Sequence, residues 1–160
     1  MRRIAAVVHS PEAPGHAEPD DTVRLDHDQR TRRRMVFTTE AGTAILLDMP
    51  RPVRLRDGDT LRLDDGACVR VEAIAEALIE IAAPTPAGLV RIAWHLGNRH
   101  LPAQLLHGAN GTCLRIRHDH VIVEMVEGLG GSCLPVLAPF EPEGGAYAVA
   151  THGHHGHGHG

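Results

Sequence analysis

The chain has 160 residues, 42% of them hydrophobic, which is enough for one ordinary domain or two small ones with a buried core. Its net charge of −4 argues against a general nucleic-acid binder, because such proteins need a basic surface to neutralise phosphates. No apolar run approaches the length of a membrane span and the run over 4–8 is too short for a signal peptide, so a cytoplasmic protein is expected.

Residues 1–75 are predicted to form an all-β domain, because short runs of alternating apolar and polar residues are separated by turn sequences. The alternation is strict over 53–56, 60–63 and 68–71, which indicates strands with one buried and one wet face. The domain is a candidate for binding a peptide or protein partner. Its one basic run, Arg30–Arg34, is flanked by acidic residues and is expected to be a solvated, internally neutralised strand or loop.

In residues 76–140 the spacing of apolar residues changes from every second position to a mixture of strand and helix spacings. A strand is predicted over 78–82, and Thr85 with Pro86 supplies an N-cap and a first-turn proline. The helix that follows should end at Gly97-Asn98. Its apolar stripe comprises Leu89, Ile92, Ala93 and Leu96.

Two further strands, about 101–107 and 112–118, are predicted to form a hairpin through residues 108–111, where Asn110-Gly111 is a strong turn signal. A second helix is expected from about Asp119, although the β-branched residues at 121–123 leave a strand as an alternative there. The apolar stripe of that helix comprises Ile122, Met125, Val126 and Leu129. A last strand over 133–137 completes the order β-α-β-β-α-β, so the whole chain is predicted to be α+β with a ferredoxin-like second domain.

Few bulky side chains are available to either core, since the chain has only four aromatic residues. Aliphatic cores of small domains gain less burial energy, and oligomerisation is a common remedy. Three cysteines cannot all pair and none lies in a C-x-x-C spacing, which fits a reducing compartment and packed thiols.

Histidines are the most informative residues, because the chain has 13 of them and they are clustered. Imidazole suits nickel, copper and zinc. His118 and His120 flank Asp119; on an extended segment they would point to one face, and the aspartate would either face away or cap the next helix. His100 has no chelating neighbour in the sequence, yet a twofold axis would bring its copy alongside.

Residues 141–160 are rich in Pro, Gly and His and are predicted to be disordered in the absence of metal. Five histidines with glycine spacers form a flexible polydentate ligand, whose binding carries an ordering cost and favours rapid exchange. They are His152, His154, His155, His157 and His159. Such a tail suits capture and release of a metal better than catalysis.

Enzyme motifs are absent from the sequence: it contains no H-E-x-x-H, no phosphate-binding glycine loop and no nucleophile elbow. The chain is therefore predicted not to be an enzyme. Three interpretations of the histidines stay open on the residues alone, namely delivery of a metal, buffering of a metal by the tail, and a zinc-dependent hydrolase.

Four segments together resemble the UreE family of urease accessory proteins. They are the string Trp94–Pro102, the segment Arg117–Val121, Gly128–Gly130 and the His-rich tail, and the likeness covers nearly the whole chain. The resemblance implies a cytoplasmic homodimer that carries nickel(II) as cargo for urease maturation. Copper and zinc are further candidate ions, because imidazole also suits them.

The same resemblance implies roles for individual residues and partners. His100 matches the interface histidine of the family, so two copies would share one nickel ion. His118 and His120 match a peripheral site of some members, and the tail histidines match residues that add nickel capacity. The implied partners are the GTPase UreG and apo-urease, with no nucleic acid and no membrane.

Overall fold

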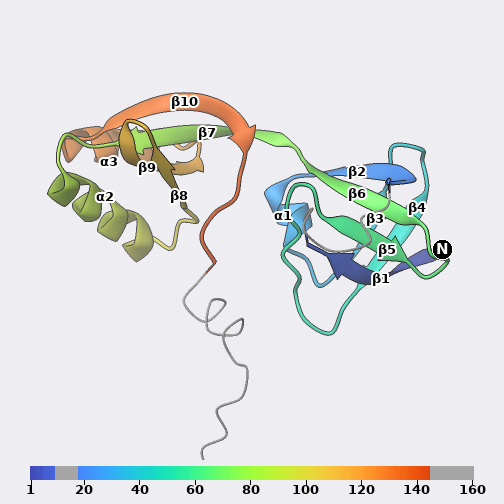
Figure 1. The fold of residues 1–160 in the computed structure, drawn as a ribbon. Helices are drawn as coiled ribbons and strands as arrows, with labels where there is room; N and C mark the ends of the chain where they lie inside the picture. The colour runs from blue at the N-terminus through green and yellow to red at the C-terminus, as the bar shows by residue number, and fades with distance from the viewer. Residues whose placement is uncertain (10–17, 145–160) are drawn as a thin grey trace, which may run out of the picture. The chain divides into compact units, whose positions relative to one another are not determined.

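The computed structural model describes residues 1–9 and 18–144, and the chain divides into two compact units (Figure 1). Unit 1 comprises Met1–Ala77 with Leu137–Phe140, and unit 2 comprises Leu78–Val136 with the segment that begins at Glu141. The predicted α+β class is confirmed. The predicted disordered tail lies beyond residue 144 and therefore outside the described residues. Within them, no helix is long and apolar enough to cross a membrane.

Unit 1 is built on a six-stranded sheet with the order β2-β6-β5-β1-β4-β3. Its strands are β1 (Arg2–Val8), β2 (Asp21–Leu25), β3 (Arg34–Thr38), β4 (Ala44–Asp48), β5 (Thr60–Leu63) and β6 (Cys68–Ala73). β1 pairs in parallel with β4, and β2 with β6, whereas the other pairs are antiparallel. The core is aliphatic apart from Phe37, as the composition predicts. The strands predicted over 60–63 and 68–71 are confirmed.

The predicted β-rich character of unit 1 is confirmed, with one helical turn, α1 (His27–Arg30), that begins after the Asp26 N-cap and has a capping box with Gln29. One strand prediction for the unit is wrong. Residues 53–56 are not a strand. Leu55 is still completely buried, as the alternation predicts. The amide of Val53 donates to the carbonyl of Arg32, in the loop after α1, and the amide of Leu55 donates to the carbonyl of Arg30, the last residue of α1, so neither pairs with a strand.

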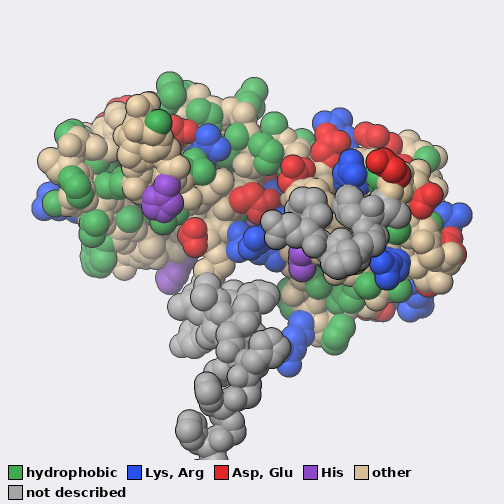
Figure 2. Space-filling model, viewed as in Figure 1, with side chains coloured by type: hydrophobic (Ala, Val, Ile, Leu, Met, Phe, Trp, Pro, Cys, Tyr) green, Lys and Arg blue, Asp and Glu red, His purple; other side chains and the backbone are tan. Residues whose placement is uncertain are grey.

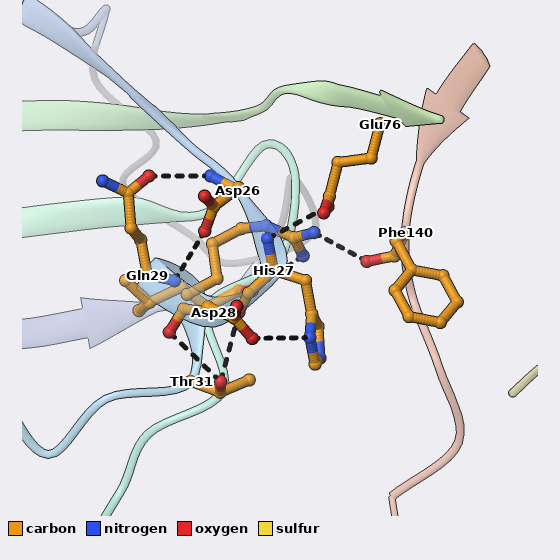
Figure 3. A network of polar contacts seen from close by, with 9 residues as sticks. Asp26, His27, Asp28, Gln29, Thr31, Glu76 and Phe140 are labelled. Atoms are coloured by element: carbon orange, nitrogen blue, oxygen red, sulfur yellow. Dashed lines mark hydrogen bonds and ion pairs between the residues drawn. The ribbon is translucent and has the colours of Figure 1, made fainter. Parts of the chain in front are cut away.

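Arg30 is the second correction, because it is buried although the whole basic run was predicted to be solvated. Its Nη2 donates to the Phe140 carbonyl at 2.6 Å and its Nη1 to the Leu55 carbonyl at 3.4 Å. Figure 3 shows this region, where the His27 amide also donates to Glu76 Oε2 and the His27 ring lies edge-on to Phe140 at 5.4 Å. The guanidinium thus connects α1 to two distant segments of the same unit.

Unit 2 has the predicted β-α-β-β-α-β order: β7 (Ala75–Ala82), α2 (Pro86–Asn98), β8 (Gln104–Gly108), β9 (Gly111–Arg117), α3 (His120–Gly128) and β10 (Ser132–Pro139). In the sheet order β10-β7-β9-β8, the first and third strands of the unit, β7 and β9, lie at the centre, and β10 and β8 lie at the edges. This is the ferredoxin-like arrangement. Helical stripe residues of α2 and α3 pack on Ile79, Ile81, Leu114 and Ile116 of the sheet.

The two predicted helices follow their sequence signals closely. Thr85 caps α2 by accepting a hydrogen bond from the Gly88 amide, and Pro86 is the first helical residue. Ile92 and Leu96 of the predicted stripe are buried, whereas Ala93 is exposed. Residues 121–123 are helical, so the strand alternative there is wrong. Ile122 and Val126 supply enough burial on one face to outweigh the β preference of the branched residues.

The hairpin between β8 and β9 is confirmed, and so is its turn through residues 108–111. Ala109 and Asn110 form the tip, because Gly108 lies opposite Gly111 in the register. Gly111 supplies the positive φ of 101°, and neither tip residue has one. The turn is tight, so β9 leads directly from the hairpin to His118.

Candidate metal centre

His100 has a left-handed backbone conformation, which residues other than glycine rarely adopt. Its φ is 57°, the one positive φ of a non-glycine residue in the described part of the chain. The conformation ends α2 in a Schellman motif, since the Leu101 amide donates to the Leu96 carbonyl and the His100 amide to the Gly97 carbonyl. Leu96 and Leu101 belong to the same apolar cluster and complete the motif. The last residue of α2 is Asn98, which agrees with the predicted end at Gly97-Asn98, and the left-handed residue His100 follows two positions later.

α3 ends in the same motif, which makes it an internal reference for α2. The Gly131 amide donates to the Val126 carbonyl and the Gly130 amide to the Glu127 carbonyl. Here the left-handed position is held by Gly130, with φ 89°. A non-glycine residue in that region costs about 1 kcal/mol or more. At the end of α2 the chain thus carries an exposed imidazole in the position where the equivalent turn of α3 has glycine.

The motif His118-Asp119-His120 spans the junction of β9 and α3. Of the two roles foreseen for Asp119, capping is the one observed, because its Oδ1 accepts hydrogen bonds from the amides of Val121 at 2.9 Å and Ile122 at 3.3 Å. His118 follows the last residue of β9, and His120 is the first residue of α3. Both imidazoles are exposed. The pair therefore lies around a helix start rather than on one face of a strand.

The sheet register brings the C-terminal ends of α2 and β9 to the same end of the sheet in unit 2. Arg117 lies opposite Leu78 and Arg115 opposite Gln104, so β9 ends where β7 and β8 begin. His100 precedes β8 by a few residues, and His118 follows β9 at once. Nevertheless, among residues 1–9 and 18–144 no group of three or more His, Cys, Asp or Glu side chains is arranged to hold a metal ion.

Other described histidines have contacts that explain them structurally. His9 Nδ1 lies 2.9 Å from the buried carboxylate of Asp59. His107 Nδ1 lies 3.3 Å from the Thr112 hydroxyl across the hairpin. The His95 ring packs edge-on against Trp94 at 5.0 Å. His100, His118 and His120, the described histidines that the sequence predicts as ligands, are all exposed.

An exposed apolar pair on α2 was not identified from the sequence. Val90 and Trp94 are 69% and 64% exposed and lie one helical turn apart, outside the buried stripe. Their spacing of i and i+4 was the available signal, because it falls on a different helix face from Ile92 and Leu96. Exposed apolar side chains grouped near a candidate ligand favour an interface there.

The cysteines are all free, and two of them have thiols that burial disfavours as thiolates. Desolvation, with Glu80 adding repulsion, raises the pKa of Cys113. Desolvation, with Glu127 adding repulsion, raises the pKa of Cys133. Because the thiolate is the metal ligand, these environments oppose metal binding by either residue near neutral pH.

We expect Cys113 and Cys133 to react with iodoacetamide more slowly than a cysteine in an unstructured peptide at pH 7.5. A raised pKa leaves less thiolate at that pH, and the rate should rise only at a higher pH than for the peptide. Peptide mapping by mass spectrometry measures each rate, and the same sites unfolded in urea are the control. Rates equal to the peptide's in the folded protein would contradict this expectation.

The five tail histidines, His152, His154, His155, His157 and His159, lie outside the described residues, so the geometry given above concerns only the two folded units.

Comparison with known proteins gives matches over both units. The family model described as the UreE urease accessory protein N-terminal domain matches residues 1–74, and that of the C-terminal domain matches residues 76–160. Proteins named urease accessory protein UreE from Rhodopseudomonas palustris strains HaA2 and BisB18 are 55% and 56% identical over 83% and 86% of this chain. The chain covers 60% and 63% of their lengths, thus less than two thirds of each. A protein of the same name from Beijerinckia indica is 44% identical over 98% of this chain and 87% of its own length.

Proposed function

The chain belongs to the UreE family of urease accessory proteins, and from this starting point we propose that it is a cytoplasmic nickel metallochaperone. In this proposal the protein carries nickel(II) as cargo, delivers it for assembly of the urease active site and is not itself an enzyme. The GTPase UreG and apo-urease are the proposed partners. Copper and zinc are proposed as further ions that the same imidazoles accept.

His100 carries the proposal. A strained, exposed histidine at the end of a helix is costly for the fold and is best explained by a function of the side chain. Since the described part of one chain places no complete ligand group around it, we propose that two chains contribute one His100 each to a shared nickel site. His118 and His120 would form a peripheral site, and the tail histidines would add capacity.

A homodimer through the region of α2 is supported by the exposed pair Val90 and Trp94. Aromatic and aliphatic side chains of this size are enriched at the centre of interfaces, where they exclude water. Val90 and Trp94 lie on α2, and His100 follows the end of that helix by two residues. A dimer that buries this pair would also bring two copies of His100 towards one another.

The experiment that tests delivery uses the full chain and a variant in which the five tail histidines are replaced by serine. Apo-urease and UreG are supplied with limiting nickel that has been preloaded on the accessory protein, and urease activity is measured over time. A chaperone acting through the folded units should retain most of the activation in the tail variant, with a smaller nickel capacity.

The alternative function is a metal buffer that acts mainly through the tail, and the same experiment separates the two. A buffer would lose its effect when the five histidines are replaced, because the folded units would then be a passive carrier. Urease activation no better than with free nickel, for both proteins, would contradict delivery altogether.

A further inference from the structure

Two segments of unit 1 lie side by side and carry an unusual density of arginine. The amides of Met49 and Val53 donate to the carbonyls of Arg33 and Arg32 at 3.0 and 3.3 Å, so the segment 30–34 runs beside the segment 48–56. All 16 basic residues of the chain are arginine. Five exposed ones on these two segments are here called the arginine band. The band comprises Arg32, Arg33, Arg34, Arg51 and Arg56.

The band is not neutralised within the described part of the chain. Ion pairs connect Arg2 with Asp65, Arg24 with Glu72, and Arg115 with Glu80, whereas none within 4.0 Å joins a band guanidinium to a described carboxylate. Figure 2 shows that charged side chains of both signs are denser over unit 1 than over unit 2. The charge of the band therefore persists although acidic residues are abundant in the same unit.

Three of the five acidic residues that flank the run in the sequence accept hydrogen bonds from backbone amides. Asp20 accepts from the Cys68 amide, Asp21 from Thr22, and Asp26 from Gln29. Two acidic residues next to the band behave alike, since Asp57 accepts from the Ala73 amide and Asp59 from the Arg56 amide. Asp48, opposite Arg34 in the β3–β4 ladder, is an acidic neighbour at the edge of the band.

The band rests on a rigid support. Arg30 and Leu55 are 1% and 0% exposed and connect the two segments. The Arg30 side chain donates to the Leu55 carbonyl, and the Leu55 amide donates to the Arg30 carbonyl. Pro50 and Pro52 fix φ on either side of Arg51. Guanidiniums mounted on an ordered backbone lose less entropy when they bind.

We propose that the arginine band is a docking surface for an acidic segment of a protein partner. Guanidinium groups bind carboxylates through two parallel hydrogen bonds, and five uncompensated ones provide charge complementarity to such a segment. Nucleic acid fits less well, because segments 30–34 and 48–56 contain no aromatic side chain that would add base stacking to the contacts of the guanidiniums. This docking is independent of the metal site.

The test measures binding of a fluorescein-labelled peptide of twelve alternating Glu and Asp residues to the full chain by fluorescence anisotropy. A peptide of Gln and Asn is the neutral probe, and a twelve-nucleotide single-stranded RNA is the nucleic-acid probe. The variant Arg32→Ser/Arg33→Ser/Arg51→Ser removes three band charges, and Arg3→Ser/Arg62→Ser/Arg91→Ser removes three exposed arginines from elsewhere. Circular dichroism confirms that each variant is folded.

We expect salt-sensitive binding of the acidic peptide that weakens about tenfold in the band variant and less than about twofold in the control variant. Binding of the neutral peptide at the same affinity would overturn the proposal. So would equal losses in the two variants, because the effect would then be one of overall charge. Tighter, band-dependent binding of the RNA than of the acidic peptide would assign the surface to nucleic acid and also overturn it.

Discussion

Replacing His100 with glycine is expected to abolish shared nickel binding and at the same time to stabilise the fold. In a full chain whose five tail histidines are serine, we expect one tightly bound nickel per two chains, and at least about a 100-fold loss of affinity on losing both imidazoles. Glycine adopts the φ of 57° found at this position without steric cost, as Gly130 does at the end of α3. The free energy of unfolding should therefore rise by up to about 1 kcal/mol.

Calorimetry with light scattering measures the nickel stoichiometry and affinity, and urea denaturation measures stability. His100→Ala is the second variant: it should lose the nickel but not gain stability, because alanine retains the strain. His107→Gln is the matched control, since His107 contacts Thr112 in the hairpin, and it should bind nickel like the parent. Unchanged nickel binding by the dimer after either His100 substitution would refute the shared site.

Replacing Arg30 with methionine is expected to cause the largest loss of stability of any single arginine change. The substitution keeps the volume of the side chain but leaves the carbonyls of Leu55 and Phe140 without these donors. A buried acceptor left unsatisfied costs about 1–3 kcal/mol, so a loss of about 3 kcal/mol is expected for the pair. Urea denaturation followed by circular dichroism measures the change.

Arg32→Met is the control for Arg30→Met, because Arg32 belongs to the same run and is exposed. It should change the free energy of unfolding by no more than about 0.5 kcal/mol. Hydrogen exchange adds a local measurement, since the segment Leu137–Phe140 should lose protection in the Arg30 variant. A stability difference below about 1 kcal/mol between the two variants would show that the Arg30 hydrogen bonds contribute little.

Sequence patterns predicted unit 2 better than unit 1, for a physical reason. The ferredoxin-like unit consists of long elements with caps and apolar stripes at local spacing, such as Thr85 with Ile92 and Leu96. Unit 1 depends on pairings between distant segments, and a local pattern cannot say which partner a residue finds. The alternation at 53–56 correctly indicated that Leu55 is buried, but its amide pairs with Arg30 and not with a strand.

The burial of Arg30 was beyond sequence reasoning for the same reason. One arginine of a run of four is selected for burial by the carbonyls of Leu55 and Phe140, which are 25 and 110 residues away. At the candidate site, the histidines were found from their clustering, and Asp119 was foreseen as a possible cap. The left-handed conformation of His100 was not foreseen, because a histidine two residues past the helix end carries no sequence signal for a positive φ.

The solitary position of His100 has a consequence for how tightly the protein holds its cargo. If each chain brings only one imidazole of the shared site, the affinity for the metal is coupled to the association of the chains. Dilution would then weaken metal binding, and metal would in turn favour association. Any partner or condition that separates the two chains would also release the metal ion. The release of nickel would then depend on contacts between proteins and not on the chemistry of the ligands alone.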